Sequence, residues 1–335
     1  MIKSLYTYVG EGVNPYENLA LEEVLLENVP EESCILYLWQ NQKTVVIGKN
    51  QNAWSECKIK ELQADGGHLA RRLSGGGAVF HDLGNLNFTF LVRTEDYDLD
   101  KQLDVIMTAV KSLGIKAEKS GRNDIITQDG RKFSGNAFYH NGNKSYHHGT
   151  IMMNVDKERV ADYLNVSAAK LASKGVKSVK SRVVNLTELN PDITVESMTK
   201  ALFKAFDEIY SGKAVPFELS EENRNEIAKL KSRNESFEWI FGKKIQFDLK
   251  LENRFTWGGV EIDLQVDEGK VLEAMIYSDA MDANFIAKFA EPLVGQRFSS
   301  DNLANSLKTL TNNGLSNLQK QMLDDIILYM ANQEF

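Results

Sequence analysis

The stretch with the clearest chemical potential is RRLSGGGAVFHD, which runs from Arg71 to Asp82. Three consecutive glycines leave the backbone bare between a pair of arginines and an apolar run. Glycine at a strand break permits close approach of another group to the backbone, and an arginine side chain binds carboxylates and phosphates. The pattern is typical of a site for an elongated ligand with an anionic end. A glycine-rich turn beside two solvated arginines has the same composition.

The two commonest phosphate-binding loops do not account for this stretch. A P-loop requires GxxxxGK[ST], but Gly48 and Lys49 are followed by Asn50. A dinucleotide fingerprint, GxGxxG, requires a glycine where Phe80 stands. Any nucleotide site here is therefore of another kind.

A second candidate is the basic segment KLASKGVKSVKSR, from Lys170 to Arg182, which holds five cations and no acid in a chain of net charge -8. Gly175 makes one regular helix less favourable. A loop whose cations close over phosphates and a solvated basic helix face both fit this composition.

Lys132 follows a predicted Asp129-Gly130 hairpin turn and precedes Ser134 and Gly135. These small neighbours leave space for a ligand, so the ammonium group could stabilise a charge that grows during a reaction. A lysine at the start of a strand is more commonly a surface residue. The ligand reading therefore depends on the neighbouring motifs.

Asp124, which follows Asn123, is a candidate oxygen ligand for Mg2+ carrying nucleotide phosphates. An aspartate that caps a turn has the same local sequence. Both interpretations stay open from the residues alone.

Zinc chemistry and nucleophilic catalysis are disfavoured. His140, His147 and His148 match no common zinc spacing, and Cys34 and Cys57 lie far from them in the sequence. Neither cysteine falls in the glycine-rich, lysine-containing or HHGT segments, and no GxSxG motif occurs.

The elements that must position these residues alternate between helix and strand, without internal repeats. Asn14 and Pro15 predict the start of an amphipathic helix over 14–29. We expect 34–39 and 44–48 to be strands joined by a hairpin loop at 40–43. The remaining expected helices are 54–65, 101–114, 194–210 and the carboxy-terminal region; the remaining expected strands lie in 68–74, 78–82, 86–92, 124–154 and 255–277.

Composition bounds the fold and its setting. A chain of 335 residues with 42% hydrophobic content can form one large domain or two unequal ones, which we place at 1–247 and 248–335. Its net negative charge argues against nucleic acid as a partner. Two cysteines without a disulfide framework, no signal peptide and no long apolar run predict a cytoplasmic protein away from membranes.

Taken together, the motifs resemble the lipoate-protein ligase A family within the biotin/lipoate protein ligase superfamily. The matching segments occur in the family's order and approximate spacing: RRLSGGGAVFHDLGNLNFTF, GRNDI, RKFSGNA, HHGT, KLASKGVKSVKSRVVNLTEL and FTWGGVE. The similarity runs from residue 18 into the carboxy-terminal part, and the last two segments favour the ATP-using ligase. It implies an α+β fold: a lipoate/ATP-binding catalytic domain related to biotin ligases and class II synthetases, plus a small C-terminal α+β accessory domain.

The resemblance also implies roles for individual residues. Lys132 matches the lysine that contacts both lipoate and the adenylate, and Arg72 matches a nucleotide-contacting arginine. The adenylate loop corresponds to 170–185. Some relatives carry an arginine where this chain has Tyr139. The other implied contacts are the ATP-binding strand (Gly77, Ala78, Val79, Phe80), the lipoate pocket (Ser74, Gly75, Gly76, His148, Gly149) and the loop cations (Lys174, Lys180, Arg182).

The implied reaction uses ATP and Mg2+ to convert lipoate to lipoyl-AMP with release of pyrophosphate. The lipoyl group is then transferred to a lysine of a lipoyl-domain acceptor, either a 2-oxoacid dehydrogenase E2 subunit or the glycine cleavage H protein. Two alternatives stay open: an ATP-independent octanoyl or lipoyl acyltransferase with a cysteine nucleophile, and a non-catalytic lipoate- or nucleotide-binding homologue. The cysteine positions argue against the first; Lys132, Arg72 and the basic segment argue against the second.

Overall fold

The computed structural model describes residues 2–121, 123–165, 183–242 and 245–334, and it divides into two compact units. Unit 1 comprises Met1–Ile47, Trp54–Arg72 and Ala78–Ile240. Unit 2 comprises Gly48–Ala53, Leu73–Gly77 and Phe241–Phe335. Two short segments from the amino-terminal part thus belong to unit 2, and one of them contains the three consecutive glycines. A single boundary between residues 247 and 248 does not describe this division.

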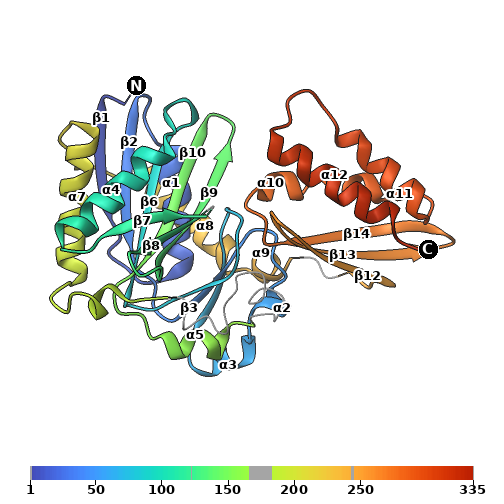
Figure 1. Ribbon diagram of the computed structural model, residues 1–335, viewed down its shortest axis with the longest axis horizontal. Helices are drawn as coiled ribbons and strands as arrows, with labels where there is room; N and C mark the ends of the chain where they lie inside the picture. Colours follow the sequence, from blue (N-terminus) through green and yellow to red (C-terminus); the bar gives the residue numbers. More distant parts are fainter. Residues whose placement is uncertain (1, 122, 166–182, 243–244, 335) are drawn as a thin grey trace. The chain divides into compact units, whose positions relative to one another are not determined.

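The main sheet of unit 1 has eight strands in the order β11-β1-β2-β6-β10-β9-β8-β7 (Figure 1). Strand β1 runs parallel to both β2 and β11, and the pairs from β2 to β7 are antiparallel. In sheet order, the strands are β11 (Val215–Pro216), β1 (Ser4–Val9), β2 (Ser33–Trp39), β6 (Asn85–Arg93), β10 (Lys144–Met152), β9 (Lys132–Asn141), β8 (Asp124–Thr127) and β7 (Ala117–Ser120).

Helices cover both faces of this sheet. Alternate residues of β2, Cys34, Leu36 and Leu38, pack in one apolar core with residues of α4 and α7. Tyr37, between them, points to the other face, where its hydroxyl lies 3.3 Å from Oδ1 of Asn18 in α1. Every residue of β2 is buried, as expected of a strand covered on both faces. Among the described residues of unit 1, the long helices are α1 (Pro15–Glu27), α4 (Leu99–Ser112), α7 (Val195–Tyr210) and α8 (Glu221–Glu235).

The start of α1 confirms the prediction from Asn14 and Pro15. The Asn14 side chain accepts hydrogen bonds from the backbone N–H groups of Tyr16 and Glu17, at 2.9 and 3.2 Å. Pro15 occupies the first helical turn, where its missing N–H costs nothing. The cap therefore fixes where the helix begins.

The expected hairpin between 34–39 and 44–48 is wrong. Strand β3 (Thr44–Ile47) leaves the main sheet and pairs with β4 (His68–Arg71) and β5 (Val79–His81) in a separate sheet of order β4-β3-β5. The connecting residues are held by the start of α1, because Asn18 Nδ2 donates to the carbonyl of Gln40 at 2.8 Å. A two-strand turn cannot form while this linker is anchored to the helix.

The helix expected over 54–65 is also interrupted. It forms as α2 (Ala53–Glu56) and α3 (Ile59–Ala64), because Cys57 makes an isolated antiparallel bridge to Leu164. Gly66, with φ of +69°, follows the second piece and ends it. The other short helices of unit 1 are η1 (Thr94–Asp96), α5 (Lys157–Tyr163), η3 (Leu186–Glu188) and α9 (Phe237–Phe241).

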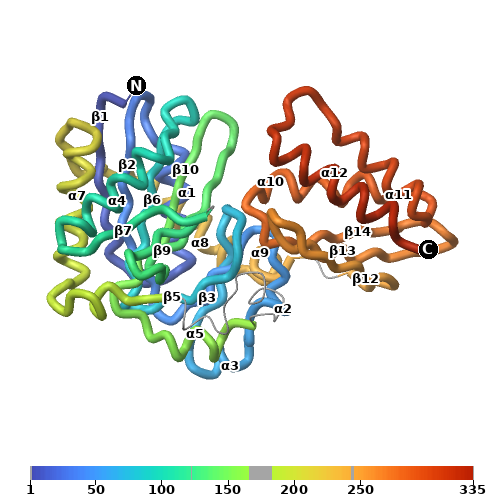
Figure 2. The backbone as a smooth tube through the Cα atoms, in the orientation of Figure 1, coloured from blue at the N-terminus to red at the C-terminus, as the bar shows by residue number. Residues whose placement is uncertain are grey.

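Unit 2 is built from a three-stranded antiparallel sheet, order β12-β13-β14, followed by helices (Figure 2). Its own core joins apolar residues of the strands to those of α11 and α12. Both units are thus mixed helix and strand, as expected. The elements are β12 (Leu249–Phe255), β13 (Gly258–Asp267), β14 (Lys270–Ser278), α10 (Ala283–Ile286), η4 (Glu291–Leu293), α11 (Ser300–Leu307), η5 (Lys308–Leu310) and α12 (Asn317–Ala331).

Within the described ranges, no helix combines the length and the apolar character that crossing a bilayer requires.

Candidate active site

Lys132 is the first residue of β9, directly after a turn in which Gly130 has φ of +82°. Its Nζ lies 2.7 Å from Oδ1 of Asp124, the first residue of the neighbouring strand β8. A Cβ on Gly135 would lie only 2.6 Å from the same Nζ. The glycine therefore provides the space in which the ammonium group sits, whereas its small size had suggested space for a ligand.

Asp124 acts in this structure as the counter-ion of Lys132, a role that the sequence did not indicate. The Asp124 side chain is 10% exposed and that of Lys132 is 21% exposed, so solvent screens the pair only partly. Among the described residues, no group of three or more His, Cys, Asp and Glu side chains is placed to hold a metal ion. A single carboxylate is compatible with Mg2+, which commonly binds through one or two carboxylates together with substrate phosphates.

Arg72 directly follows β4, is 6% exposed and donates from Nη1 to the carbonyl of Val46 at 3.2 Å. Burial lowers the pKa of Arg72 to about 10, while Tyr146 and Glu22 oppose that shift. A guanidinium with this pKa remains charged at neutral pH. Unit 1 therefore contains a buried, positively charged side chain at this position.

Arg71 has a different environment from its neighbour. Its guanidinium donates to the backbone carbonyls of Trp239 and Ile240, at 3.0 and 2.5 Å. The indole Nε1 of Trp239 donates in return to the carbonyl of Arg71 at 3.0 Å. Arg71 thus joins β4 to α9, and the two arginines of the motif have separate tasks.

Sequence reasoning missed Glu22, a buried carboxylate of α1. Its Oε1 accepts from Thr89 Oγ1 at 2.7 Å and lies 2.9 Å from Nδ1 of His148. Trp39 Nε1 completes the group by donating to Thr89 Oγ1 at 3.1 Å. The available signal was a carboxylate four residues after Asn18, which places both polar groups on one helix face.

His147 and His148 serve different networks. Burial lowers the pKa of His147 to about 3, so its ring is neutral. Its nitrogens lie 2.8 Å from Oδ1 of Asn136 and 3.1 Å from Oε1 of Gln102. A neutral imidazole has one N–H, so one of these amides must present its nitrogen to the ring. The backbone N–H of Asn136 also donates to the carbonyl of Asn123 at 2.8 Å. This bond fixes the position of Asn123, the residue that precedes Asp124 in the sequence.

The glycines of the motif contact their own chain closely. A Cβ on Gly75 would lie 2.3 and 2.5 Å from the carbonyl oxygens of Ala280 and Met281, in unit 2. The N–H of Gly76, which has φ of +88°, donates to the Ala280 carbonyl at 3.2 Å. Gly75 is therefore required by backbone packing inside unit 2, a reason that the sequence could not supply.

The remaining predicted residues are distributed between the units. Val79 and Phe80 lie in β5, and Phe80 packs on Tyr163 with ring centroids 5.3 Å apart. Gly149 lies in β10, where a Cβ would meet Phe88 at 2.6 Å. Ala78 belongs to unit 1, Ser74 and Gly77 belong to unit 2, and Lys174, Lys180 and Arg182 lie outside the described residues.

Two family models match the chain. The model described as "Lipoyl protein ligase A/B catalytic domain" matches residues 14–207, and the one described as "Bacterial lipoate protein ligase C-terminus" matches residues 244–327. A protein of Bdellovibrio bacteriovorus named lipoate-protein ligase A is 37% identical over 337 aligned residues, which cover 97% of this chain and 99% of the relative. The chain belongs to the lipoate-protein ligase family. It is therefore an enzyme, a ligase, and the resemblance seen in the motifs is confirmed.

Other relatives agree with this assignment. A lipoate-protein ligase A of Psychrobacter cryohalolentis is 42% identical over 298 residues, covering 87% of this chain and 88% of the relative. The crystal structure of Plasmodium falciparum LipL1 in complex with lipoate is 30% identical, with a TM-score of 0.83; the match covers 98% of this chain and 100% of that one. A bipartite lipoate-protein ligase of Thermoplasma acidophilum, studied with its E2 lipoyl domain, is 25% identical with a TM-score of 0.65, over 74% and 100% of the two chains.

Both cysteines of this ligase are free, buried and poorly suited to nucleophilic attack. Burial raises the pKa of Cys57 to about 12, with a smaller contribution from Glu61. Burial raises the pKa of Cys34 still further, although a hydrogen bond with Tyr210 opposes the shift. Because the thiolate is the nucleophilic form, neither thiol is prepared to accept an acyl group at neutral pH.

We therefore expect the double variant Cys34→Ser/Cys57→Ser to keep most of the ligase activity. Any loss should follow the melting temperature, since a buried cysteine packs as a small apolar side chain. The measurement is the rate of lipoyl transfer beside a thermal melt. A stable double variant without activity would support the thiol-dependent acyltransferase instead.

Proposed function

We propose that this ligase uses ATP to convert lipoate to lipoyl-AMP with release of pyrophosphate, and then transfers the lipoyl group to a lysine of an acceptor protein. The observation that best supports this proposal is the position of Lys132, beside Gly135 and against Asp124. A partly buried cation at this position suits a reaction in which negative charge moves between a carboxylate and a phosphate.

The chemistry requires activation because a carboxylate is a poor acyl donor. One oxygen of the lipoate carboxylate attacks the α-phosphorus of ATP, a new P–O bond forms, and the bond to pyrophosphate breaks. The amine of the acceptor lysine then attacks the carbonyl of the mixed anhydride, and AMP leaves. Charge develops on phosphoryl oxygens in the first step and on the carbonyl oxygen in the second. In this proposal Lys132 stabilises both.

Asp124 is the residue we propose to hold Mg2+, together with the phosphates of ATP. Bound there, Mg2+ would neutralise charge on the leaving pyrophosphate. The carboxylate already faces Lys132 at 2.7 Å, so Asp124 also orients the ammonium group. These two roles are compatible because a carboxylate has two oxygens with several acceptor positions.

We propose that the nucleotide is contacted by Arg72 and by residues that follow it in the chain, Gly77, Ala78, Val79 and Phe80. Support comes from the charge of the buried Arg72 guanidinium. Within unit 1, we propose that His148 and Gly149 contact lipoate, and the proposed adenylate loop includes Lys174, Lys180 and Arg182. The network of Glu22, Thr89 and Trp39 would hold His148 in one orientation.

The proposed acceptors are the lipoyl domains of 2-oxoacid dehydrogenase E2 subunits and the glycine cleavage H protein. The relative from Thermoplasma acidophilum was studied together with its E2 lipoyl domain, which supports the first of these. We also propose a cytoplasmic location, in keeping with two free cysteines.

Release of pyrophosphate without any acceptor protein tests the proposed function. Mixing the enzyme with ATP, Mg2+ and lipoate should release pyrophosphate up to the amount of enzyme and then slow, because lipoyl-AMP stays bound until an acceptor arrives. Omitting lipoate should abolish the release. No release with all three substrates would indicate either the ATP-independent acyltransferase or a non-catalytic homologue.

A further inference from the structure

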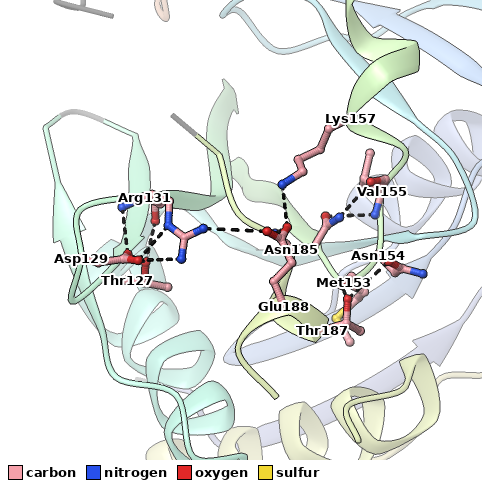
Figure 3. A network of polar contacts seen from close by, with 10 residues as sticks. All are labelled: Thr127, Asp129, Arg131, Met153, Asn154, Val155, Lys157, Asn185, Thr187 and Glu188. Carbon is pink, nitrogen blue, oxygen red and sulfur yellow. Dashed lines mark hydrogen bonds and ion pairs between the residues drawn. The ribbon is translucent and has the colours of Figure 1, made fainter. Parts of the chain in front are cut away.

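Glu188, in η3, joins three segments of unit 1 that are distant in sequence (Figure 3). Its Oε1 accepts from the backbone N–H of Asn185 at 2.8 Å and from Nζ of Lys157 at 2.6 Å. Its Oε2 lies 3.8 Å from Nη1 of Arg131. One carboxylate therefore contacts its own helix cap, the start of α5 and the residue directly before Lys132.

The backbone of Lys132 is held by residues just ahead of this cap. Val184 donates its N–H to the carbonyl of Lys132 at 2.9 Å, and Val183 forms a parallel bridge with Lys132. Val184 is fully buried. Val184 directly precedes Asn185 in the chain. The position of Asn185 therefore affects the position of the residues that bond to the main chain of Lys132.

Asn185 is fixed on its other side by the chain that follows β10. Its Oδ1 accepts from the N–H of Val155 at 3.0 Å, and its Nδ2 donates to the Val155 carbonyl at 2.9 Å. Thr187 Oγ1 adds a bond to the carbonyl of Met153 at 2.9 Å. These bonds attach η3 to the chain directly after β10, whereas Glu188 points toward Arg131, the residue before Lys132 in the sequence (Figure 3).

The contacts of Glu188 contribute little to the stability of the fold, but they orient the groups that Glu188 binds. Burial acts to raise its pKa, but the bonds from Lys157 and Asn185 and the charges of Lys157 and Arg131 outweigh it, so the pKa is lowered. The carboxylate is therefore ionised at neutral pH. Its side chain is 38% exposed, and exposed ion pairs stabilise a fold only weakly. Arg131 is also held by Asp129, whose Oδ2 lies 2.7 Å from its Nε.

We propose that Glu188 is a positioning residue for Lys132. It orders the Asn185 cap and Arg131 together, so that the backbone on both sides of the Lys132 carbonyl keeps the orientation that directs its ammonium group to the substrate. This inference rests on the role of Lys132 proposed above. A small displacement of a catalytic group lowers the rate strongly while leaving substrate affinity nearly unchanged.

The variant Glu188→Gln tests the proposal, because an amide oxygen can still accept from Asn185 while the charge is lost. We expect kcat for lipoate-dependent exchange between ATP and pyrophosphate to fall about tenfold, with each KM within about twofold of the parent value. Lys157→Met, which removes a partner from the other end of the same ion pair, should lower kcat in the same direction. Glu196→Gln is the matched control, since Glu196 pairs with Lys200 on the surface of α7.

The proposed role and a purely structural role predict different results. If Glu188 acts through Lys132, the variant Glu188→Gln should have no further effect on the rate in a Lys132→Ala background. The melting temperature of Glu188→Gln should then match that of Glu196→Gln. Unchanged kcat in both Glu188→Gln and Lys157→Met would overturn the proposal, as would a further loss of rate in the Lys132→Ala background. Absence of exchange in the parent enzyme would instead refute the proposed function, so the two failures are distinguishable.

Discussion

Lys132→Ala is expected to lower the rate of lipoyl-AMP formation about 10²- to 10³-fold, the typical effect of removing one group that stabilises transition-state charge. The reason is electrostatic: the variant loses a partly buried ammonium group next to Gly135, where charge is proposed to develop. The measurement is single-turnover release of pyrophosphate from ATP in the presence of lipoate and Mg2+. Folding should be retained, because truncating Lys132 leaves room for water to solvate the Asp124 carboxylate, whose side chain is 10% exposed.

Lys144→Ala provides a matched control for this variant. Lys144 is also the first residue of a strand, β10, and its side chain is 17% exposed, close to the 21% of Lys132. It is similarly ion-paired, with Glu27, and its Nζ donates to the Glu27 carbonyl at 2.8 Å. We expect adenylation in Lys144→Ala at near the parent rate. Equal rates for Lys132→Ala and the parent would show that the role assigned to Lys132 is wrong.

The second large effect concerns the arginine pair. Arg72→Met is expected to lower kcat/KM for ATP about 10²-fold, because charged hydrogen bonds contribute about 1.5–3 kcal/mol each. Arg71→Met should instead lower the melting temperature clearly and keep kcat. It leaves the buried carbonyl of Ile240, and that of Trp239, without the guanidinium that bonds them.

Kinetics and thermal melts of the two variants separate these roles. Each substitution removes a buried guanidinium from adjacent positions of one chain, so the change in composition is identical. We expect the kinetic loss in Arg72→Met to persist at temperatures below the melting temperature of that variant. If Arg71→Met and Arg72→Met lost kcat/KM equally while both remained folded, the nucleotide role given to Arg72 alone would be incorrect.

The parts of the fold that the sequence predicted are those set by local chemistry. The cap formed by Asn14 and Pro15 placed the start of α1 correctly, because its hydrogen bonds join neighbouring residues. Periodicity similarly placed α4 and α7. The motif around Lys132 indicated a candidate site residue because Ser134 and Gly135 lie within three residues of it in the chain.

What could not be predicted depends on contacts between distant segments. The linker after β2 has the composition of a hairpin turn. Asn18, more than 20 residues earlier in the chain, binds this linker instead, so β3 leaves the main sheet. Glu22 looks like a surface residue of an amphipathic helix until His148 and Thr89 are placed beside it. The close approach of Ala280 to Gly75 spans about 200 residues, and no local pattern encodes it.

The central claim is that this ligase couples ATP to lipoylation of a protein lysine, and the mass of an acceptor tests it most directly. A lipoyl domain is incubated with the enzyme, lipoate, ATP and Mg2+, and its intact mass is then measured. We expect the gain of one lipoyl group on one lysine, dependent on ATP and about 10²- to 10³-fold slower with Lys132→Ala. An unmodified domain, or the same gain without ATP, would contradict it.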